Sequence, residues 1–235
     1  MGKNVAAVIL AAGSGSRMGL KVTKQRLYIS GKSVIRRAAE AFDRCEEITS
    51  ITVVVRDGEI EFAKEELRGI EKIKGIVVGG DSRAASAKIG FDFAKEDADY
   101  IAIHDGARCL ITPAMISAVV EDAVKYGAAT ASSRITDTVK TCDGTGTVLS
   151  TLNRDELRLV QTPQIFRTDL YEKALSKLDS LDASYTDDNM LLEAIGANIH
   201  CTDTGKSNIK ITEKEDLPLA EFLVNYNNNG ENCNE

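Results

Sequence analysis

The amino-acid sequence predicts an α/β fold in which a mostly parallel β-sheet has helices on both faces and a β-hairpin arm projecting from it. Two observations support this fold class. Short apolar runs of strand length alternate with segments of helical periodicity, an order typical of parallel sheets. One Thr-rich segment, at about residues 134–160, breaks that alternation. It contains two alternating runs around the turn sequence DGTG, a pattern typical of a hairpin.

Four apolar runs have the length of buried strands. They show little alternation of apolar and polar residues, as is typical of strands covered on both faces. The runs are Val5–Leu10, Ile51–Val55, Gly75–Gly80 and Tyr100–Asp105. With helical segments between them, they predict a Rossmann-like sheet.

Helix-start signals accompany three of the periodic segments. Ser33 is a candidate N-cap before an amphipathic run, because its hydroxyl can accept a hydrogen bond from a backbone N–H of the first turn. Thr112 is followed by Pro113, and proline is favoured at the first helical position. Near the C-terminus, Thr212 and Glu215 stand at capping-box spacing. We therefore expect a helix to begin at each of these places.

The chain shows no internal repeat and no low-complexity linker that would divide it. We expect a single domain over residues 1–225, with the arm inserted, and a polar tail at residues 226–235. A projecting arm has little core of its own and needs a partner surface. A homodimer formed through the arm is therefore the expected assembly.

Composition narrows the expected partners and compartment. The chain has 235 residues, of which 43% are hydrophobic, and its net charge of −7 argues against nucleic acid or an anionic membrane as the main partner. The five cysteines show no CxxC pair, and no apolar run reaches the length of a membrane span. We expect reduced thiols in a cytoplasmic protein.

The sequence LAAGSGSRMG, at residues 10–19, begins at the end of the first predicted strand. Two phosphate-binding motifs fail to account for it. A P-loop has a glycine five residues before the glycine of its Gly-Lys-Ser triplet. The chain has two such triplets, and Arg26 and His200 occupy the positions where that glycine would be needed. The dinucleotide fingerprint, which would indicate an NAD-dependent oxidoreductase, has its third glycine one position late.

A triphosphate site explains more of this segment. A glycine-rich turn after a strand presents backbone N–H groups to phosphate oxygens. Arg17 can grip those oxygens with its planar fork, and Lys24 can place a point charge on the phosphorus under attack. The plainer alternative is that both cations are solvated surface charges.

The glycine-rich segment followed by KQ resembles the sugar-phosphate nucleotidyltransferases. Further motifs follow in the same order as in one family of these enzymes: GGDSRAASAKIG, IHDGAR, TDTVK, QTPQIF, TDD and NIKIT. With them, the chain from Val5 to Phe222 resembles the 2-C-methyl-D-erythritol 4-phosphate cytidylyltransferases. The implied reaction transfers CMP from CTP to 2-C-methyl-D-erythritol 4-phosphate. It gives 4-diphosphocytidyl-2-C-methylerythritol and pyrophosphate in non-mevalonate isoprenoid biosynthesis. The alternative on the same scaffold is a ribitol-5-phosphate, or pentitol-phosphate, cytidylyltransferase.

Such a reaction needs little acid–base machinery. A phosphomonoester, with a second pKa of about 6, is already largely dianionic at neutral pH. The difficulty is to bring two anions together, so positioning and positive charge should dominate catalysis. The sequence agrees, since it has two histidines and no convincing nucleophile–base pair. We expect His104, in an apolar strand, to be buried and hydrogen-bonded.

The resemblance also implies the roles of individual residues. Arg17, Lys24 and Lys210 match catalytic cations, and Asp105 matches a residue that holds Mg²⁺ or another divalent cation. A non-catalytic nucleotide sensor with the same fold would be expected to lack such a cation or acid. The matching nucleotide-binding positions are Ala12, Gly13, Ser14, Gly15, Gly80, Asp81, Arg83, Ser86, Asp105 and Gly106, and the substrate-binding ones, some from a neighbouring subunit, are Thr138, Arg154, Thr162 and Thr186.

Two positions depart from the family pattern. Thr23 stands where relatives commonly have proline, and Ser207 lies where many have an acidic residue. The first departure leaves the charge of Lys24 in place. The second removes a candidate second carboxylate for the metal.

Overall fold

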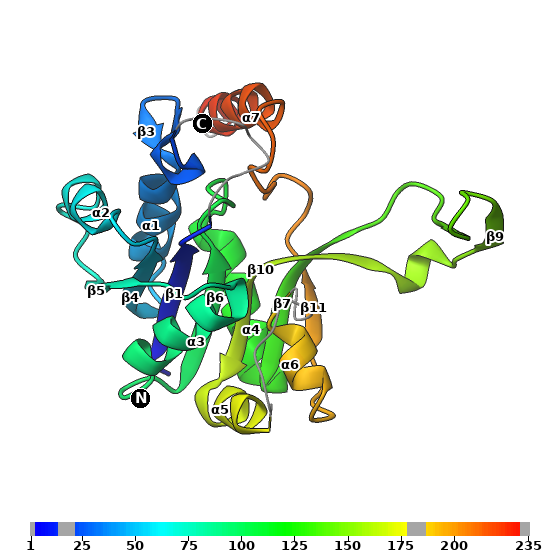
Figure 1. Cartoon of the computed structure of the whole chain (residues 1–235), viewed down its shortest axis with the longest axis horizontal. Helices are drawn as coiled ribbons and strands as arrows, with labels where there is room; N and C mark the ends of the chain where they lie inside the picture. The colour runs from blue at the N-terminus through cyan, green and yellow to red at the C-terminus, as the bar shows by residue number, and fades with distance from the viewer. Residues whose placement is uncertain (1–2, 14–21, 178–186, 231–235) are drawn as a thin grey trace.

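The computed structural model of the chain describes residues 3–13, 22–177 and 187–230, the last four of these by backbone alone. Its centre is a seven-stranded sheet (Figure 1). Across the sheet the strands follow in the order β11 (His200–Asp203), β7 (Ala128–Arg134), β10 (Arg158–Arg167), β6 (Tyr100–Asp105), β1 (Val5–Ala11), β4 (Ile48–Val55) and β5 (Ile73–Val78). Strand β10 is antiparallel to both of its neighbours, and the other pairs are parallel. The predicted fold class is confirmed.

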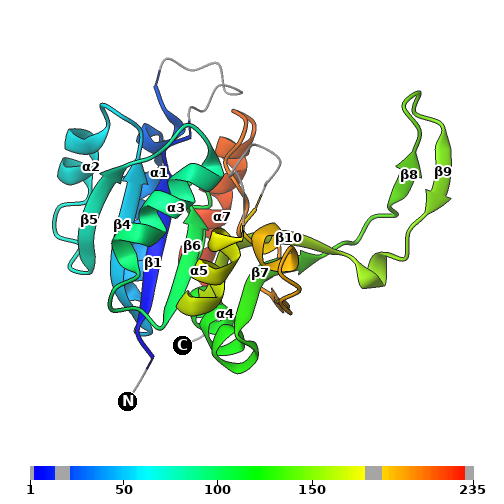
Figure 2. The same cartoon turned by 60° about the horizontal axis from the view of Figure 1, so that its bottom comes forward.

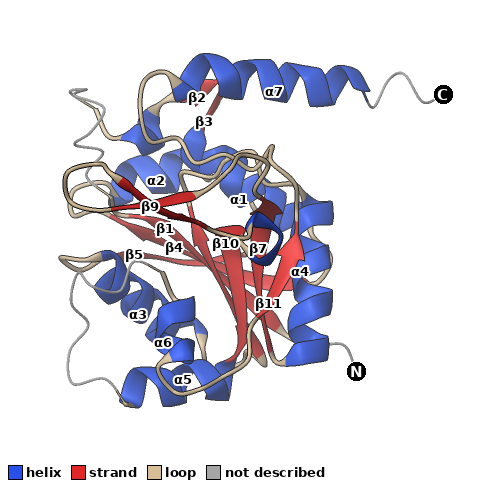
Figure 3. Cartoon of the chain, turned by 90° about the vertical axis from the view of Figure 1, so that its right-hand side faces the viewer, coloured by secondary structure: helices blue, strands red, loops and turns tan. Residues whose placement is uncertain are grey.

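Helices cover both faces of this sheet, as Figure 3 shows. One face packs against α1 (Val34–Arg44), α2 (Ile60–Glu66) and α4 (Pro113–Tyr126), and the other against α3 (Arg83–Ala94), α5 (Thr168–Ser176) and α6 (Asn189–Glu193). Within the described part of the chain, every helix is too short or too polar to cross a membrane.

Strand β1 shows why the strand sequences barely alternate. Val5, Ala7 and Ile9 are buried with α1 and α4, whereas Ala6 and Val8 are buried with α3. Successive side chains of a strand point to opposite faces of the sheet. A strand covered on both faces therefore needs an apolar residue at every position.

Two of the three predicted helix starts are confirmed. The Ser33 hydroxyl accepts a hydrogen bond from the backbone N–H of Arg36 (3.2 Å), and the Thr112 hydroxyl accepts one from that of Met115 (3.3 Å). Both residues have extended backbone and stand directly before a helix. The first turns of α1 and α4 therefore form where their sequences place a capping hydroxyl.

The third predicted helix start is wrong, because α7 (Asp216–Gly230) begins after Thr212 rather than at it. The carboxylate Oδ2 of Asp216 accepts hydrogen bonds from the backbone N–H groups of Thr212 (2.7 Å) and Glu213 (2.8 Å). These two hydrogen bonds hold the preceding turn outside the helix. At its other end α7 includes residues 226–230, which were predicted to belong to a polar tail.

The hairpin arm extends from the sheet on the side opposite β5 (Figure 2). Strands β8 (Lys140–Cys142) and β9 (Val148–Thr151) form its antiparallel ladder, and the turn η3 (Arg154–Glu156) leads back to β10. Large apolar side chains of the arm face solvent, with Val148 57% and Leu149 66% exposed. The arm therefore offers an apolar surface that this chain does not cover.

The close packing of α3 on the sheet predicts a penalty for any side chain at Gly90. A Cβ built there would lie 2.3 Å from Val8 Cγ1 and 2.8 Å from Val54 Cγ2. We expect Gly90→Ala to lower the free energy of unfolding by about 1–3 kcal/mol, although alanine has the higher helix propensity. Urea denaturation measures the change. Gly144→Ala, where a Cβ meets nothing within 4 Å, is the control, and an unchanged Gly90→Ala would contradict this packing.

Candidate functional site

The carboxyl ends of the parallel strands β1, β4 and β6 meet at one edge of the sheet, which is where such sheets usually bind ligands. Asp105 is the last residue of β6, and the backbone N–H of Gly106 donates to the carbonyl of Leu10 in β1 (2.9 Å). The predicted residues Ala12 and Gly13 directly follow β1. Two predicted parts of the site, the glycine-rich turn and Asp105, therefore begin side by side.

The short helix η2 (Lys24–Arg26) lies against the same edge. A Cβ built at Gly106 would be 3.3 Å from Gln25 Oε1, and one built at Gly13 would be 3.8 Å from Lys24 Cε. The bare backbone of Gly106 thus leaves room for Gln25 of η2, whereas the 3.8 Å at Gly13 is an ordinary contact distance that shows only that Lys24 lies beside the end of β1. The approach of η2 brings Lys24 to the edge that Asp105 occupies.

The carboxylate of Asp105 lies between two cations. Its Oδ2 accepts a hydrogen bond from Lys210 Nζ (2.6 Å), and its Oδ1 accepts one from Arg83 Nε (3.1 Å). The Asp105 side chain is only 12% exposed. Burial would raise the pKa of this carboxyl group, but the charges of Arg83 and Lys210 hold the pKa well below its usual range. Asp105 is therefore ionised at neutral pH.

Arg83 joins Asp105 to a second buried carboxylate. Its Nη1 donates to Asp188 Oδ2 (2.7 Å), and Asp188 Oδ1 accepts from the hydroxyl of Tyr171 (2.6 Å). The backbone N–H of Asp188 donates to Gln164 Oε1 (2.9 Å). Residues from α3, β6, β10, α5 and the start of α6 are thereby fixed around one guanidinium group.

The predicted base-binding loop lies between β5 and α3 and is tightly packed. A Cβ at Gly79 would lie 2.7 Å from Ser86 Oγ, and one at Gly80 would lie 2.7 Å from Ala85 Cβ. The backbone N–H of Gly80 donates to Ser86 Oγ (3.2 Å). Ser82 supplies the N-cap of α3. The loop is therefore built from backbone and small side chains, and the carboxylate of Asp81 has no part in the cap.

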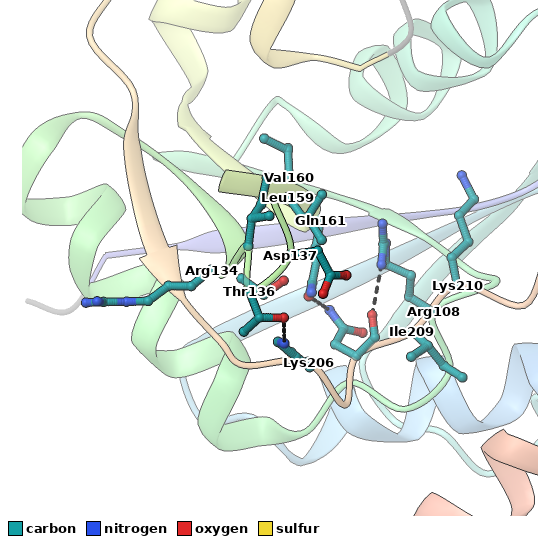
Figure 4. Close-up of a pocket in the computed structure, with 13 residues that line it drawn as sticks. Arg108, Arg134, Thr136, Asp137, Leu159, Val160, Gln161, Lys206, Ile209 and Lys210 are labelled. Carbon is teal, nitrogen blue, oxygen red and sulfur yellow. Dashed lines mark hydrogen bonds between the residues drawn. The ribbon is translucent and has the colours of Figure 1, made fainter. Parts of the chain in front are cut away.

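A cavity of about 490 Å³ opens at the base of the arm (Figure 4). Among the described residues that line it, four are cationic (Arg108, Arg134, Lys206 and Lys210) and one, Asp137, is acidic. Lys210 belongs both to this cavity and to the ion cluster of Asp105. The excess of positive charge suits an anionic ligand beside the cluster.

Comparison with known proteins identifies the family to which this arrangement belongs. A family model described as 2-C-methyl-D-erythritol 4-phosphate cytidylyltransferase matches residues 5–226. The chain belongs to this family. Two relatives of that name, from Pelotomaculum thermopropionicum and Endomicrobium trichonymphae, are each 40% identical to it over 223 and 221 residues. The matches cover 94% and 93% of this chain and 94% and 98% of the relatives.

Solved structures share the fold of this cytidylyltransferase. The 4-diphosphocytidyl-2C-methyl-D-erythritol synthase of Anaerococcus prevotii matches with a TM-score of 0.82 and 28% identity, over 96% of this chain and 100% of that one. The 2-C-methyl-D-erythritol 4-phosphate cytidylyltransferase of Thermus thermophilus gives a TM-score of 0.75 and 28% identity, over 95% and 98% of the two chains. The likeness therefore extends over the whole length of the chain.

Some predicted site residues of this cytidylyltransferase lie apart from the cluster. Thr138 and Arg154 are on the arm, and within the described residues no hydrogen bond or ion pair joins either of them to Asp105 or Lys210. Arg154 Nη1 instead donates to the carbonyl of Thr136 at the base of the arm. The other predicted positions Ser14, Gly15, Arg17 and Thr186 lie outside the described residues.

Two residues of the cavity and of the ion cluster were not predicted from the sequence. Arg108 lines the cationic cavity, and Asp188 holds Arg83. Both stand inside motifs used for the resemblance, IHDGAR and TDD. The motifs therefore marked these two residues, but their partners are distant in the sequence, so their roles could not be inferred from neighbouring residues.

Thr162 and His104 lie together beneath Asp105. The Thr162 hydroxyl accepts a hydrogen bond from the backbone N–H of Asp105 (3.0 Å) and lies 3.1 Å from His104 Nδ1. His104 is fully buried, and burial lowers the pKa of its imidazole to about 3. The prediction of a buried, hydrogen-bonded histidine is confirmed.

Asp105 fits a divalent cation of the Mg²⁺ type. Among the described residues no three His, Cys, Asp or Glu side chains gather to hold a metal ion. Mg²⁺ commonly rests on one or two carboxylates together with substrate phosphates. Each oxygen of Asp105 accepts one hydrogen bond from a cation, which leaves a further lone pair on each oxygen.

The low pKa of Asp105 makes the stability of the chain depend on pH. A carboxyl group whose folded pKa lies below its unfolded value of about 3.9 stabilises the fold above that value, and the contribution is lost as pH falls through the folded pKa. Lys210→Met removes one charge that lowers this pKa. We expect the variant to be less stable than the parent near neutral pH, with a difference that shrinks below about pH 4.

Urea denaturation across this pH range measures the effect of Lys210→Met. Lys206→Met is the matched control, because Lys206 Nζ donates to Thr136 Oγ1 (2.8 Å) and not to Asp105. The change in unfolding free energy caused by Lys206→Met should therefore not vary with pH as the Asp105 carboxyl group is protonated. A Lys210→Met difference that stays constant with pH would show that Lys210 does not act through this carboxylate.

Proposed function

We propose that this chain transfers CMP from CTP to 2-C-methyl-D-erythritol 4-phosphate at the cluster around Asp105. The products are 4-diphosphocytidyl-2-C-methylerythritol and pyrophosphate, as in non-mevalonate isoprenoid biosynthesis. Family membership supports this acceptor over ribitol 5-phosphate. The observation that carries the proposal is the meeting of Lys24, Arg83 and Lys210 at the strand edge where Asp105 ends β6.

The nucleotide is proposed to lie along this edge. Ala12 and Gly13 begin the turn for the triphosphate, which continues through Ser14, Gly15 and Arg17. The backbone of Gly80 and Asp81, with Ser86, forms the pocket for cytosine, and its tight packing favours a pyrimidine by size. Arg83 links this loop to the reacting end, because its guanidinium group contacts Asp105 as well as Asp188.

The chemical step needs charge more than proton transfer. An oxygen of the acceptor phosphate attacks the α-phosphorus of CTP. The bond from that phosphorus to the oxygen that bridges the α- and β-phosphates breaks. Pyrophosphate leaves with the electron pair. Because the attacking phosphate is already ionised, Arg17, Lys24 and Lys210 serve to offset the charge on the five-coordinate phosphorus. A divalent cation, if held by the carboxylate of Asp105, would supply further positive charge to the phosphate oxygens.

The acceptor is proposed to bind beside Lys210 and to need a second copy of the chain. Thr162 and Thr186 are its predicted contacts from the same subunit. Thr138 and Arg154 lie on the arm, without a hydrogen bond or ion pair to Asp105 or Lys210 among the described residues, and are proposed to serve the site of a partner subunit over which the arm extends. The exposed Val148 and Leu149 support such a homodimer, because apolar arm surface needs cover.

A cytoplasmic location is also proposed. Cys45, Cys109, Cys142 and Cys201 are free thiols in the structure. Proteins of oxidising compartments usually pair their cysteines. Unpaired thiols on a nucleotide-using enzyme agree with a reducing compartment that supplies CTP.

Incubation with CTP, Mg²⁺ and either acceptor, followed by mass spectrometry, tests the proposed reaction. We expect the CDP-linked methylerythritol and pyrophosphate. Product from ribitol 5-phosphate alone would overturn the acceptor assignment. Absence of product from both would overturn the proposed function.

Loss of the cation on η2 should slow the chemical step. We expect Lys24→Ala to lower kcat by at least about 100-fold, the range for removal of one transition-state charge contact. Steady-state kinetics with saturating CTP and acceptor measures this. Lys32→Ala, which removes an exposed ion pair with Glu40, is the control and should turn over normally. Near-normal kcat in Lys24→Ala would remove Lys24 from the mechanism.

Subunit mixing tests whether Arg154 serves the neighbouring site. Arg154→Ala should raise the KM for the acceptor far more than the KM for CTP. A mixture of Lys24→Ala and Arg154→Ala chains in equal amounts, refolded together and assayed at an acceptor concentration far below the raised KM, should then recover about a quarter of the parental activity, because half of the dimers contain one intact site of two. Each variant refolded alone is the control. Mixing that restores nothing would show that Arg154 acts within its own chain.

A further inference from the structure

A closed circuit of hydrogen bonds lies beneath the Asp105–Lys210 ion pair, and His104 is its centre. His104 Nε2 lies 3.2 Å from the carbonyl oxygen of Arg108. A carbonyl oxygen can only accept, so Nε2 bears the hydrogen. The neutral ring then accepts at Nδ1, and the Thr162 hydroxyl at 3.1 Å donates to it. The oxygen of that hydroxyl in turn accepts from the backbone N–H of Asp105 (3.0 Å).

The circuit returns through Asn208. Arg108 Nη1 donates to the backbone carbonyl of Asn208 (2.8 Å), and Asn208 Nδ2 donates to the backbone carbonyl of Thr162 (2.9 Å). Both His104 and Asn208 are fully buried. Two residues beyond Asn208 stands Lys210, which contacts Asp105. The circuit thus holds β6, the turn after it, β10 and the loop before α7 in one arrangement.

We propose that His104 is a positioning residue for cytidylyl transfer: it fixes the backbone of Asp105 through Thr162 and the backbone carbonyl of Arg108 directly, and thereby the places from which the Asp105 carboxylate and the Arg108 guanidinium extend. The proposal rests on the proposed function. His104 touches no substrate, since both ring nitrogens are occupied and the ring is enclosed, with its centroid 4.9 Å from that of Phe42. It therefore does not act as a base.

The direction of the circuit also assigns a role to Thr162. Its single hydroxyl hydrogen is committed to His104 Nδ1, so towards any other group the hydroxyl can only accept. A phosphate oxygen is itself an acceptor and needs a donor. Thr162 therefore holds Asp105 through its side chain, and its predicted contact with the acceptor is to a hydroxyl group of that molecule, which can donate, and not to the phosphate.

Two amide variants test the two hydrogen bonds of His104 separately. In His104→Asn the shorter amide lies near the position of Nδ1 and can still accept from Thr162, but contact with Arg108 is lost. We expect kcat within about threefold of the parent and an acceptor KM raised by about tenfold or more. In His104→Gln the longer side-chain amide can still donate to the carbonyl oxygen of Arg108, but the hydrogen bond from the Thr162 hydroxyl is lost. We expect kcat to fall about 10- to 100-fold, with the acceptor KM little changed.

A spectroscopic measurement tests the circuit without relying on activity. Nitrogen NMR of the parent chain with labelled histidine should show His104 protonated at Nε2 and bare at Nδ1. The opposite tautomer, or a doubly protonated ring, would overturn the assigned direction. His200→Gln, in the other histidine of the chain, identifies the resonances and should leave kcat and KM unchanged.

kcat and KM are compared per folded molecule, and the unfolding midpoint of each variant shows whether it is folded under the assay conditions. If His104→Asn and His104→Gln alter kcat and KM alike, or leave both at parental values per folded molecule, His104 only packs the core and the proposal fails. The parent chain is assayed first. A parent that forms no CDP-alcohol would count against the proposed function and leave the NMR result to judge the circuit.

Discussion

One buried carboxylate shared by two cations is the interaction on which the site depends. Asp105 ends a central strand and holds Arg83 from α3 and Lys210 from the loop before α7. A site that unites two phosphate groups needs several cations close together, and those cations repel one another. The carboxylate offsets that repulsion within the protein, and each of its oxygens keeps a lone pair. In the proposed function the same residue therefore holds the cations together for the anions and for a metal ion.

The sheet places this carboxylate, and glycines let the other parts approach it. Strands β1, β4 and β6 are parallel, so their carboxyl ends share one edge. Gly106 leaves room for η2, and Gly79 and Gly80 let the loop between β5 and α3 lie against that helix. Beneath the edge, buried side chains on both faces of the sheet hold the strands rigid. A rigid sheet edge with loops of small residues suits a reaction governed by positioning.

Local patterns predicted much of this structure, and long-range contacts explain what they missed. The apolar runs gave β1 and β6, and the hydroxyl of Thr112 marked the start of α4, because burial on both faces and capping act over neighbouring residues. The expected start at Thr212 was wrong because the carboxylate of Asp216 competes for the same backbone groups. Asp188 contacts Arg83 across 105 positions, a separation over which no spacing rule operates. The resemblance identified Asp105 and Lys210, but their ion pair required the fold.

A crystal structure of the chain with CTP and Mg²⁺ tests the central claim most directly. The account predicts the α-phosphate at the edge formed by Gly13, Lys24 and Asp105, with the metal on the Asp105 carboxylate and the cytosine ring against Gly80 and Ser86. The path from the α-phosphorus towards Lys210 should be open for the acceptor. A triphosphate bound elsewhere, or a metal held away from Asp105, would contradict the account.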